Sequence, residues 1–154
     1  MALRNILLEH DSGLQKKSRQ VTDFNKRIHT LLDDMRDTLE LAEGLGLAAV
    51  QIGVLRRAAV INLDGDLAEI INPEIISAEG EQTASEGCLS VPGKSGVTAR
   101  PAKLKVKAQN RNGNWCVYSC EDLKARCFAH EMDHMDGVLF SERLAPGEVM
   151  HDNE

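Results

Sequence analysis

Residues 130–134 read His-Glu-Met-Asp-His, a spacing that constrains the fold more than any other feature of the chain. In an α-helix, side chains four residues apart share one face, so His130 and His134 can both reach one metal ion. Glu131 can hold or protonate a water on that metal. The alternative is a pair of structural histidines with an incidental acid between them. The pattern therefore predicts a helix with a catalytic metal site and leaves the third ligand open.

The size and composition of the chain fit one globular domain. Its 154 residues, 42% of them hydrophobic and 27% charged, can bury a single core. We expect one catalytic domain over residues 1–154, with a flexible tail from about residue 146. The formal net charge is −6 and no basic block occurs, which argues against direct nucleic-acid binding.

Nothing in the sequence predicts export or membrane insertion. No stretch approaches the ~20 apolar residues of a membrane span. The short apolar run near the N-terminus is interrupted by Arg4, Glu9 and Asp11, so it is not a signal-peptide core. The four cysteines form no C-x-x-C pair, so we expect free thiols, one of which can be a metal ligand, and no disulfide framework. The expected compartment is a reducing cytoplasm.

Two helices are predicted from apolar spacing and from capping residues. Asp23 can cap a first helix that runs to about Glu43, because apolar side chains recur between them every three or four residues. A second helix is expected to begin between Ser119 and Asp122. It carries both histidines and ends at Gly137.

Short strands are predicted between these helices. Residues 57–63 (RAAVINL) and 69–72 (EIIN) read as short strands, and residues 104–109 alternate apolar and polar side chains. Residues 112–113, Asn-Gly, suit a tight hairpin turn, after which 115–119 can return as the partner strand. The fold class is therefore α+β, with antiparallel or mixed β-sheets packed around a central C-terminal helix that carries the metal-binding histidines.

A candidate for the third metal ligand lies upstream, in residues 85–92. Gly87 permits close approach of the backbone before Cys88, and Pro92 fixes the exit of the segment. A thiolate with two neutral imidazoles leaves one position open, as in catalytic metal sites. A zincin-type endopeptidase would instead take its third ligand after the helix, where His151 lies in a polar tail. Spacing alone fits a small buried hydrophobic residue at Cys88 equally well.

Residues 44–51, Gly-Leu-Gly-Leu-Ala-Ala-Val-Gln, form a third unusual segment. Read alone, it fits a helix cap followed by an apolar stretch, and it does not match a dinucleotide-binding fingerprint. Gln51 stands out because a buried amide must find a partner. Near a metal, that amide can donate to a developing oxyanion.

Segments 44–51, 86–90 and 130–134, in this order and spacing, resemble the three signature motifs of the peptide deformylase family. The resemblance covers nearly the whole chain. It implies a metal-dependent hydrolase that removes the formyl group from N-formylmethionine of newly made polypeptides. It also implies Fe²⁺ as the native metal, with Zn²⁺ or Ni²⁺ found in preparations.

The resemblance implies a role for each matched residue. The metal ligands are Cys88, His130 and His134, with a water in the fourth place. Glu131 is the general acid/base, and the oxyanion donors are Gln51 and the backbone N–H of Leu89. The alternative is a catalytically silent metal-binding protein that retains the deformylase fold, although a decayed site would be free to lose Glu131 first.

A pocket for the methionine side chain is expected beside the metal, partly from helix positions three, four and seven before His130. Its predicted lining residues are Leu45, Gly46, Gly87, Leu123, Arg126 and Cys127. Arg126 stands where the family is usually apolar, and we expect its stem to line the pocket with the guanidinium at the mouth. Glu86 and Arg100 are expected to form either a supporting pair or a simple surface pair.

Formyl-Met nascent peptides are the expected partners, and the resemblance adds transient contact with the ribosome. Some bacterial members dock through a basic C-terminal helix, which the acidic end of this sequence does not predict. We expect a monomer that binds neither membranes nor nucleic acid directly.

Overall fold

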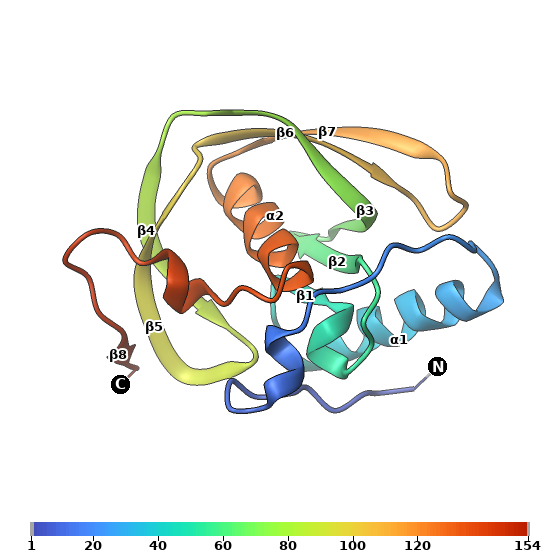
Figure 1. The fold of residues 1–154 in the computed structure, drawn as a ribbon, viewed down its shortest axis with the longest axis horizontal. Helices are drawn as coiled ribbons and strands as arrows, with labels where there is room; N and C mark the ends of the chain where they lie inside the picture. The colour runs from blue at the N-terminus through green and yellow to red at the C-terminus, as the bar shows by residue number, and fades with distance from the viewer. Residues whose placement is uncertain (1, 154) are drawn as a thin grey trace.

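Helix α2 (Asp122–Met135) runs through the middle of the molecule with β-strands on both sides, as Figure 1 shows. The computed structural model describes residues 2–153. A five-stranded sheet has the order β1-β2-β3-β6-β7, and a three-stranded sheet has the order β4-β5-β8. All the pairings between these strands are antiparallel. The predicted α+β fold around a C-terminal helix is confirmed.

The other elements follow the chain in a simple order. The strands are β1 (Gly46–Ala48), β2 (Ala58–Leu63), β3 (Asp66–Glu79), β4 (Gln82–Cys88), β5 (Val91–Arg100), β6 (Lys103–Gln109), β7 (Trp115–Glu121) and β8 (His151–Asp152). The remaining helices are α1 (Lys26–Ala42) and the short 3-10 helices η1 (Ser12–Gln15), η2 (Ala49–Ile52) and η3 (Phe140–Arg143). Within residues 2–153, no helix is long and apolar enough to cross a membrane.

Strand β2 shows why both faces of the five-stranded sheet are buried. Successive side chains of a strand point to opposite faces. Ala59 and Ile61 therefore pack in the core beneath α2, while Ala58 and Val60 pack in the core beneath α1. A strand covered on both faces carries consecutive apolar residues, as residues 58–61 do, and residues 57–63 were predicted as a strand.

Helix α1 begins two residues later than predicted. Its N-cap is Asn25, whose side-chain oxygen accepts hydrogen bonds from the backbone N–H groups of Arg27 (3.1 Å) and Ile28 (3.4 Å). Asp23 was therefore the wrong capping residue. Because Asp and Asn both cap helices well, spacing alone could not choose between them.

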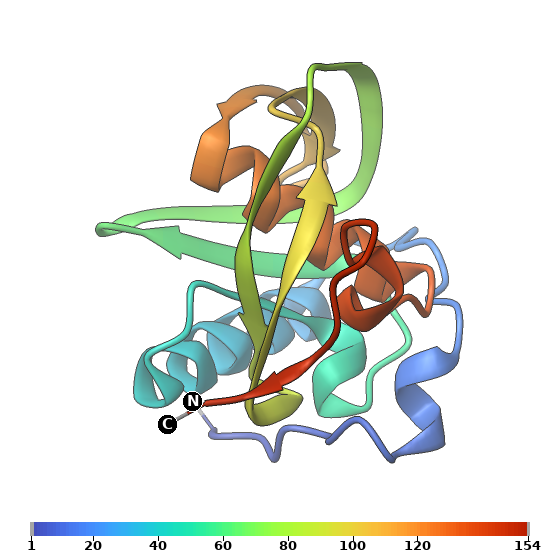
Figure 2. The same ribbon diagram turned by 90° about the vertical axis from the view of Figure 1, so that its left-hand side faces the viewer.

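Strands β4 and β5 were not predicted from the sequence. They form a long hairpin that crosses β2 and β3, as Figure 2 shows. Most side chains of β4 are exposed, so the strand lacks the alternation of apolar and polar residues that marks a half-buried strand.

The predicted flexible tail contains the last strand of the smaller sheet. Strand β8 pairs with β5 through Asp152 opposite Lys94 and His151 opposite Ser95. The side chain of His151 is exposed, and it does not belong to the cluster of metal-binding side chains found in residues 2–153.

Asp34 of α1 ties the N-terminal segment to the core. Its Oδ1 accepts a hydrogen bond from the backbone N–H of Ala2 (2.8 Å), and its Oδ2 accepts two from Arg4, at 2.7 and 3.0 Å. The hydrogen bond from Ala2 and then those from Arg4 outweigh the effect of burial, so the pKa of Asp34 lies below its ordinary value of 3.8. The charged form of Asp34 therefore stabilises the fold.

Asp34→Asn is expected to lower the free energy of unfolding at about pH 7 by about 1–3 kcal/mol. Because the folded pKa lies below the ordinary one, this stabilisation is present above about pH 4 and is lost as the pH falls through the folded pKa. The variant and the wild type should thus converge in acid. Urea unfolding at several pH values measures this, with the half-buried Asp37→Asn of the same helix as control. Equal losses in the two variants, or a gap that does not depend on pH, would contradict the assignment.

Candidate metal centre

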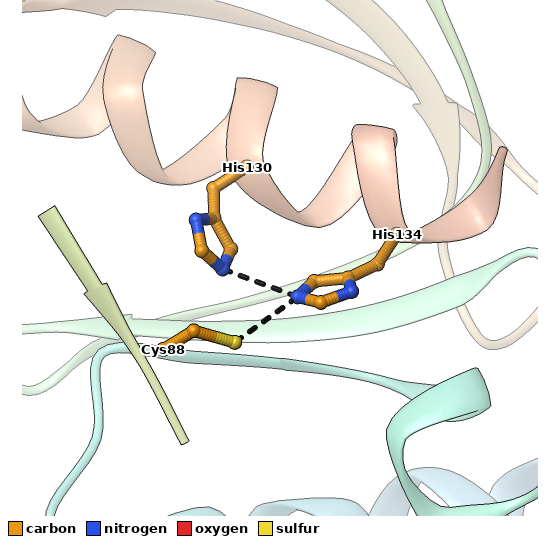
Figure 3. Close-up of side chains that lie close together, drawn as sticks. All are labelled: Cys88, His130 and His134. Atoms are coloured by element: carbon orange, nitrogen blue, oxygen red, sulfur yellow. Dashed lines mark hydrogen bonds between the residues drawn. The ribbon is translucent and has the colours of Figure 1, made fainter. Parts of the chain in front are cut away.

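The side chains of His130 and His134 project from one face of α2 toward Cys88, as Figure 3 shows. The two Nε2 atoms are 3.2 Å apart, and Nε2 of His134 lies 3.3 Å from Sγ of Cys88. All three ligand atoms lie within 4.8 Å of one another. Metal–nitrogen bonds of about 2.0–2.1 Å and metal–sulfur bonds of about 2.3 Å in tetrahedral geometry separate ligand atoms by roughly 3.3–3.6 Å. The three residues therefore fit one metal ion.

The β4–β5 hairpin carries Cys88 to this position. β4 ends at Cys88, and a two-residue turn of Leu89 and Ser90 leads into β5. The register between the strands shifts between Glu86 and Cys88. Such irregularities bend a strand and redirect its side chains, and here the thiol faces α2.

Glu86 holds His130 from the side opposite to Cys88. Nδ1 of His130 donates a short hydrogen bond to Oε1 of Glu86. An ionised carboxylate can only accept, so Nδ1 must carry the proton and Nε2 presents its lone pair to the metal position. The sequence indicated Glu86 only as a partner of Arg100, without a link to the histidine.

Three further residues bind the Glu86 carboxylate in the protein interior. Arg100 donates to it at 2.7 and 3.3 Å, Arg126 at 3.0 Å and the hydroxyl of Thr98 at 2.5 Å. Burial opposes the charge, but the hydrogen bonds from His130 and Arg100 prevail and hold the pKa of Glu86 well below its ordinary range. The Glu86–Arg100 pair is thus a buried support and not a surface pair.

Arg126 does not place its guanidinium at the mouth of the pocket, as the sequence led us to expect. The residue is 5% exposed, and its guanidinium donates to Thr98 (2.6 Å), to Gln82 (3.0 Å) and to Glu86. The buried negative charge of Glu86, together with these uncharged acceptors, holds the guanidinium inside. The hydrogen-bond partners lie on β4 and β5, which the sequence did not reveal as strands.

The electrostatics of the two histidines favour a cation between them. Burial opposes a charge on His130, but the charge of Glu131 and the hydrogen bonds that the ring donates to Cys88 and Glu86 raise its pKa well above the ordinary value. Burial and the neighbouring His130 lower the pKa of His134. One positive charge is therefore stabilised at this place, and a divalent ion suits the same set of donors.

Glu131 lies beside the ligand atoms in the interior. Burial raises the pKa of its carboxyl to about 7, although His130 opposes the increase. Among residues 2–153, the Oε1 atom of Glu131 has no hydrogen-bond partner. This buried oxygen is therefore available to a group that enters the site.

Gly46 of β1 makes room for the Glu131 carboxylate. A Cβ atom at position 46 would lie 2.5 Å from Oε2 of Glu131, closer than real Cβ contacts allow. Gly46→Ala should therefore displace the carboxylate of Glu131, the predicted general acid/base, and we expect kcat of the predicted hydrolase to fall about tenfold or more because misplacing such a group costs rate steeply. Initial rates and metal content measure this effect.

Gly13→Ala is the matched control, because its new Cβ would meet Leu7 at an ordinary 3.5 Å. If Gly46→Ala keeps full activity, Glu131 does not need the position that it occupies here.

Gln51 lies in η2 with its amide turned toward the β4–β5 turn. Its Oε1 accepts a hydrogen bond from the backbone N–H of Ala48 (2.9 Å), which fixes which way the amide points. Its Nε2 donates to Oγ of Ser90 at 3.0 Å and lies 3.5 Å from Sγ of Cys88. Leu89, whose N–H was predicted as the second oxyanion donor, lies in the turn between these two residues.

A cavity of about 320 Å³ opens beside the ligand atoms and Glu131. All six residues predicted to form the methionine pocket line it: Leu45, Gly46, Gly87, Leu123, Arg126 and Cys127. Leu45 and Leu123 are half-exposed and form its rim. Burial raises the pKa of Cys127 to about 12, so this thiol is a neutral part of the wall. Asn153 lines the cavity from the C-terminal segment and was not predicted as a site residue.

Comparison with known proteins gives one consistent result. Residues 3–149 match the family model described as polypeptide deformylase. The chain is 49% identical over 144 residues to the peptide deformylase of Caldanaerobacter subterraneus, which covers 94% of this chain and 91% of that protein.

Solved structures agree with the sequence comparison. The peptide deformylase of Legionella pneumophila superposes with a TM-score of 0.91 at 44% identity, covering 94% of this chain and 88% of that one. The peptide deformylase of Ehrlichia chaffeensis in complex with actinonin has a TM-score of 0.92 at 36% identity, covering 95% and 91%.

Proposed function

Because the chain belongs to the polypeptide deformylase family, we propose that it hydrolyses the formamide bond of N-formylmethionine at the start of newly made polypeptides. One observation carries this proposal. The three ligand atoms of Cys88, His130 and His134 converge beside the buried carboxylate of Glu131, in a chain that matches the family over nearly its full length.

Cys88, His130 and His134 would hold one divalent metal ion. Such an ion, when bound, lowers the pKa of a coordinated water toward about 7 and so supplies a nucleophile at neutral pH. Fe²⁺ is the proposed native metal, on the basis of the family resemblance, and Zn²⁺ or Ni²⁺ would fit the same donors. Elemental analysis of protein purified without oxygen tests this assignment, because a thiolate site with Fe²⁺ is sensitive to oxidation.

Glu131 moves the proton. It accepts a proton from the attacking water and returns it to the departing amine of methionine. Its buried position raises its pKa to about 7, so both transfers are accessible near neutral pH. The Oε1 atom has no hydrogen-bond partner among residues 2–153, so no hydrogen bond has to break before it accepts the proton.

Gln51 and the backbone N–H of Leu89 stabilise the oxyanion of the formyl group. The bond from Ala48 to Oε1 leaves the NH₂ group of Gln51 facing the Cys88 turn, so no reorientation is needed during the reaction. Donors that are positioned in advance contribute most to catalysis, and the loss of one typically costs about 10²–10³ in kcat.

The side chain of methionine enters the cavity of about 320 Å³ between β4 and α2. Leu45 and Leu123 cover its rim, and the neutral thiol of Cys127 lines the wall. Because the guanidinium of Arg126 is bound to Glu86 and Thr98, the residue offers its stem to the pocket.

Release of formate from a formyl-Met peptide by the metal-loaded protein tests the function. The expected result is turnover that stops when a chelator removes the metal and returns when the metal is restored. If the metal-loaded protein binds its ion stoichiometrically but releases no formate, it is the catalytically silent binding protein of the alternative.

The remaining assignments follow from the proposed activity. The enzyme acts in the cytoplasm as a monomer with a single catalytic domain over residues 1–154, where it meets nascent chains as they leave the ribosome. Size-exclusion chromatography with light scattering tests the monomer, and cosedimentation with ribosomes tests the contact.

A further inference from the structure

A second and larger cavity lies away from the metal centre. Its volume is about 910 Å³, and it is bordered by the segment before α1, the first turns of α1 and the loop between η2 and β2. It shares no lining residue with the cavity of the metal centre. The proposed deformylase function does not use it.

Positive charge collects around this cavity in a chain whose formal net charge is −6. Four cationic residues that line it form no ion pair with any acid among residues 2–153: Arg19, Lys26, Arg27 and Arg56. A fifth, Arg4, is paired with Asp34. Asp23 is the one acidic residue in the described lining.

Arg19 and Arg56 face each other with like charge. They are opposite residues of a parallel β-bridge, held by backbone hydrogen bonds from Arg19 N–H to the carbonyl of Leu55 (3.1 Å) and from Arg57 N–H to the carbonyl of Arg19 (2.9 Å). Like charges directly opposite each other across strands are destabilising. The backbone therefore places two arginines side by side, and neither forms an ion pair with a carboxylate among residues 2–153.

The first turn of α1 adds charge of the same sign. It contains Lys26 and Arg27 and no acidic residue. The N-terminus of a helix carries partial positive charge from its free N–H groups, so acidic residues are favoured there and cations are not. Two separate parts of the cavity wall thus each gather unfavourable positive charge, and one bound anion would offset both.

The cavity also has an apolar floor. Val21, Ile28 and Leu31 line it and are almost fully buried, while the hydroxyl-bearing Thr22 and Thr30 are exposed. Guanidinium groups bind phosphate oxygens in pairs and prefer them to most other anions. We propose that this cavity binds an organic phosphate with several negative charges and an apolar body, the class that nucleoside polyphosphates represent.

Titration calorimetry of the metal-loaded full-length protein with adenosine triphosphate, at about 50 mM salt, tests the proposal. We expect saturable binding that weakens steeply as salt is added. Adenosine should not bind, and inorganic phosphate should bind more weakly than the nucleotide because it lacks an apolar part. Adenosine binding as well as its triphosphate would overturn the proposal, because charge would then not be the determinant.

Arg19→Gln with Arg56→Gln should weaken binding of the triphosphate about tenfold or more, and Arg19→Lys with Arg56→Lys should weaken it less. Lys103→Gln with Lys105→Gln is the matched control, since it removes the same charge from exposed positions of β6 outside the cavity. Formate release should be unchanged in all three. Binding that persists in the Arg→Gln variant, as a nucleotide held by the metal would, overturns the proposal.

Thermal unfolding gives a second readout that does not depend on calorimetric heats. Without ligand, the Arg→Gln variant should unfold at the same temperature as the wild type or above it, because repulsion between two arginines has been removed. The triphosphate should raise the unfolding temperature of the wild type and not that of the variant. If the ligand shifts neither protein, the proposal fails whatever the outcome of the formate assay.

Discussion

Glu131→Gln is expected to lower kcat for a formyl-Met peptide by about 10²–10⁴, the usual contribution of a positioned general acid/base. The amide has nearly the same shape as the carboxylate but cannot accept and return a proton. The metal ligands are untouched, so metal content should stay equal to that of the wild type. Burial disfavours the charged form of Glu131 and raises its pKa to about 7. Replacing this buried carboxylate by a neutral amide should therefore not lower the thermal stability.

Three measurements on the same preparation make this result specific: kcat, metal content and unfolding temperature. Glu121→Gln, at the exposed N-cap position just before the same helix, is the control and should behave as the wild type. A Glu131→Gln enzyme with full metal and kcat within a factor of about three of the wild type would mean that another group moves the proton.

Glu86→Gln is expected to weaken metal binding about 10- to 100-fold, because it removes the carboxylate that orients His130. It should also lower the free energy of unfolding by about 3–5 kcal/mol, since Arg100 and Arg126 lose a charged partner in the interior. Competition with a chelator measures the first effect, and urea unfolding of the metal-free protein measures the second.

A second substitution separates these two effects. In Glu86→Gln with Arg126→Met, one buried guanidinium is removed together with its partner, so part of the lost stability should return. Metal affinity should not return, because His130 still lacks its carboxylate. Glu81→Gln, an exposed acid just before β4, is the control. If stability and metal affinity recover together, Glu86 acts on the metal only through the fold.

Most predictions that depend on contacts close along the chain succeeded, and the capping residue of α1 is the exception. The helical spacing of His130 and His134 and the consecutive apolar residues of β2 depend on residues within a few positions of one another. Predictions failed where the deciding contact lies far along the chain. The guanidinium of Arg126 was wrongly predicted to lie at the pocket mouth. Its partners lie on the β4–β5 hairpin, far upstream in the sequence, and β4 lacks the alternation of apolar and polar residues by which a strand is recognised.

The sequence by itself determined the α+β architecture, the family and the identity of the residues in the three motifs, since local periodicity and motif order are properties of the chain. Only the tertiary structure decided how the pairs of like and unlike charges are arranged. It buries Glu86 among two arginines and His130, and it places Arg19 opposite Arg56 on the wall of a separate cavity. The reason is physical: the energy of a charge depends on its distance to other charges and on its burial, and folding fixes both.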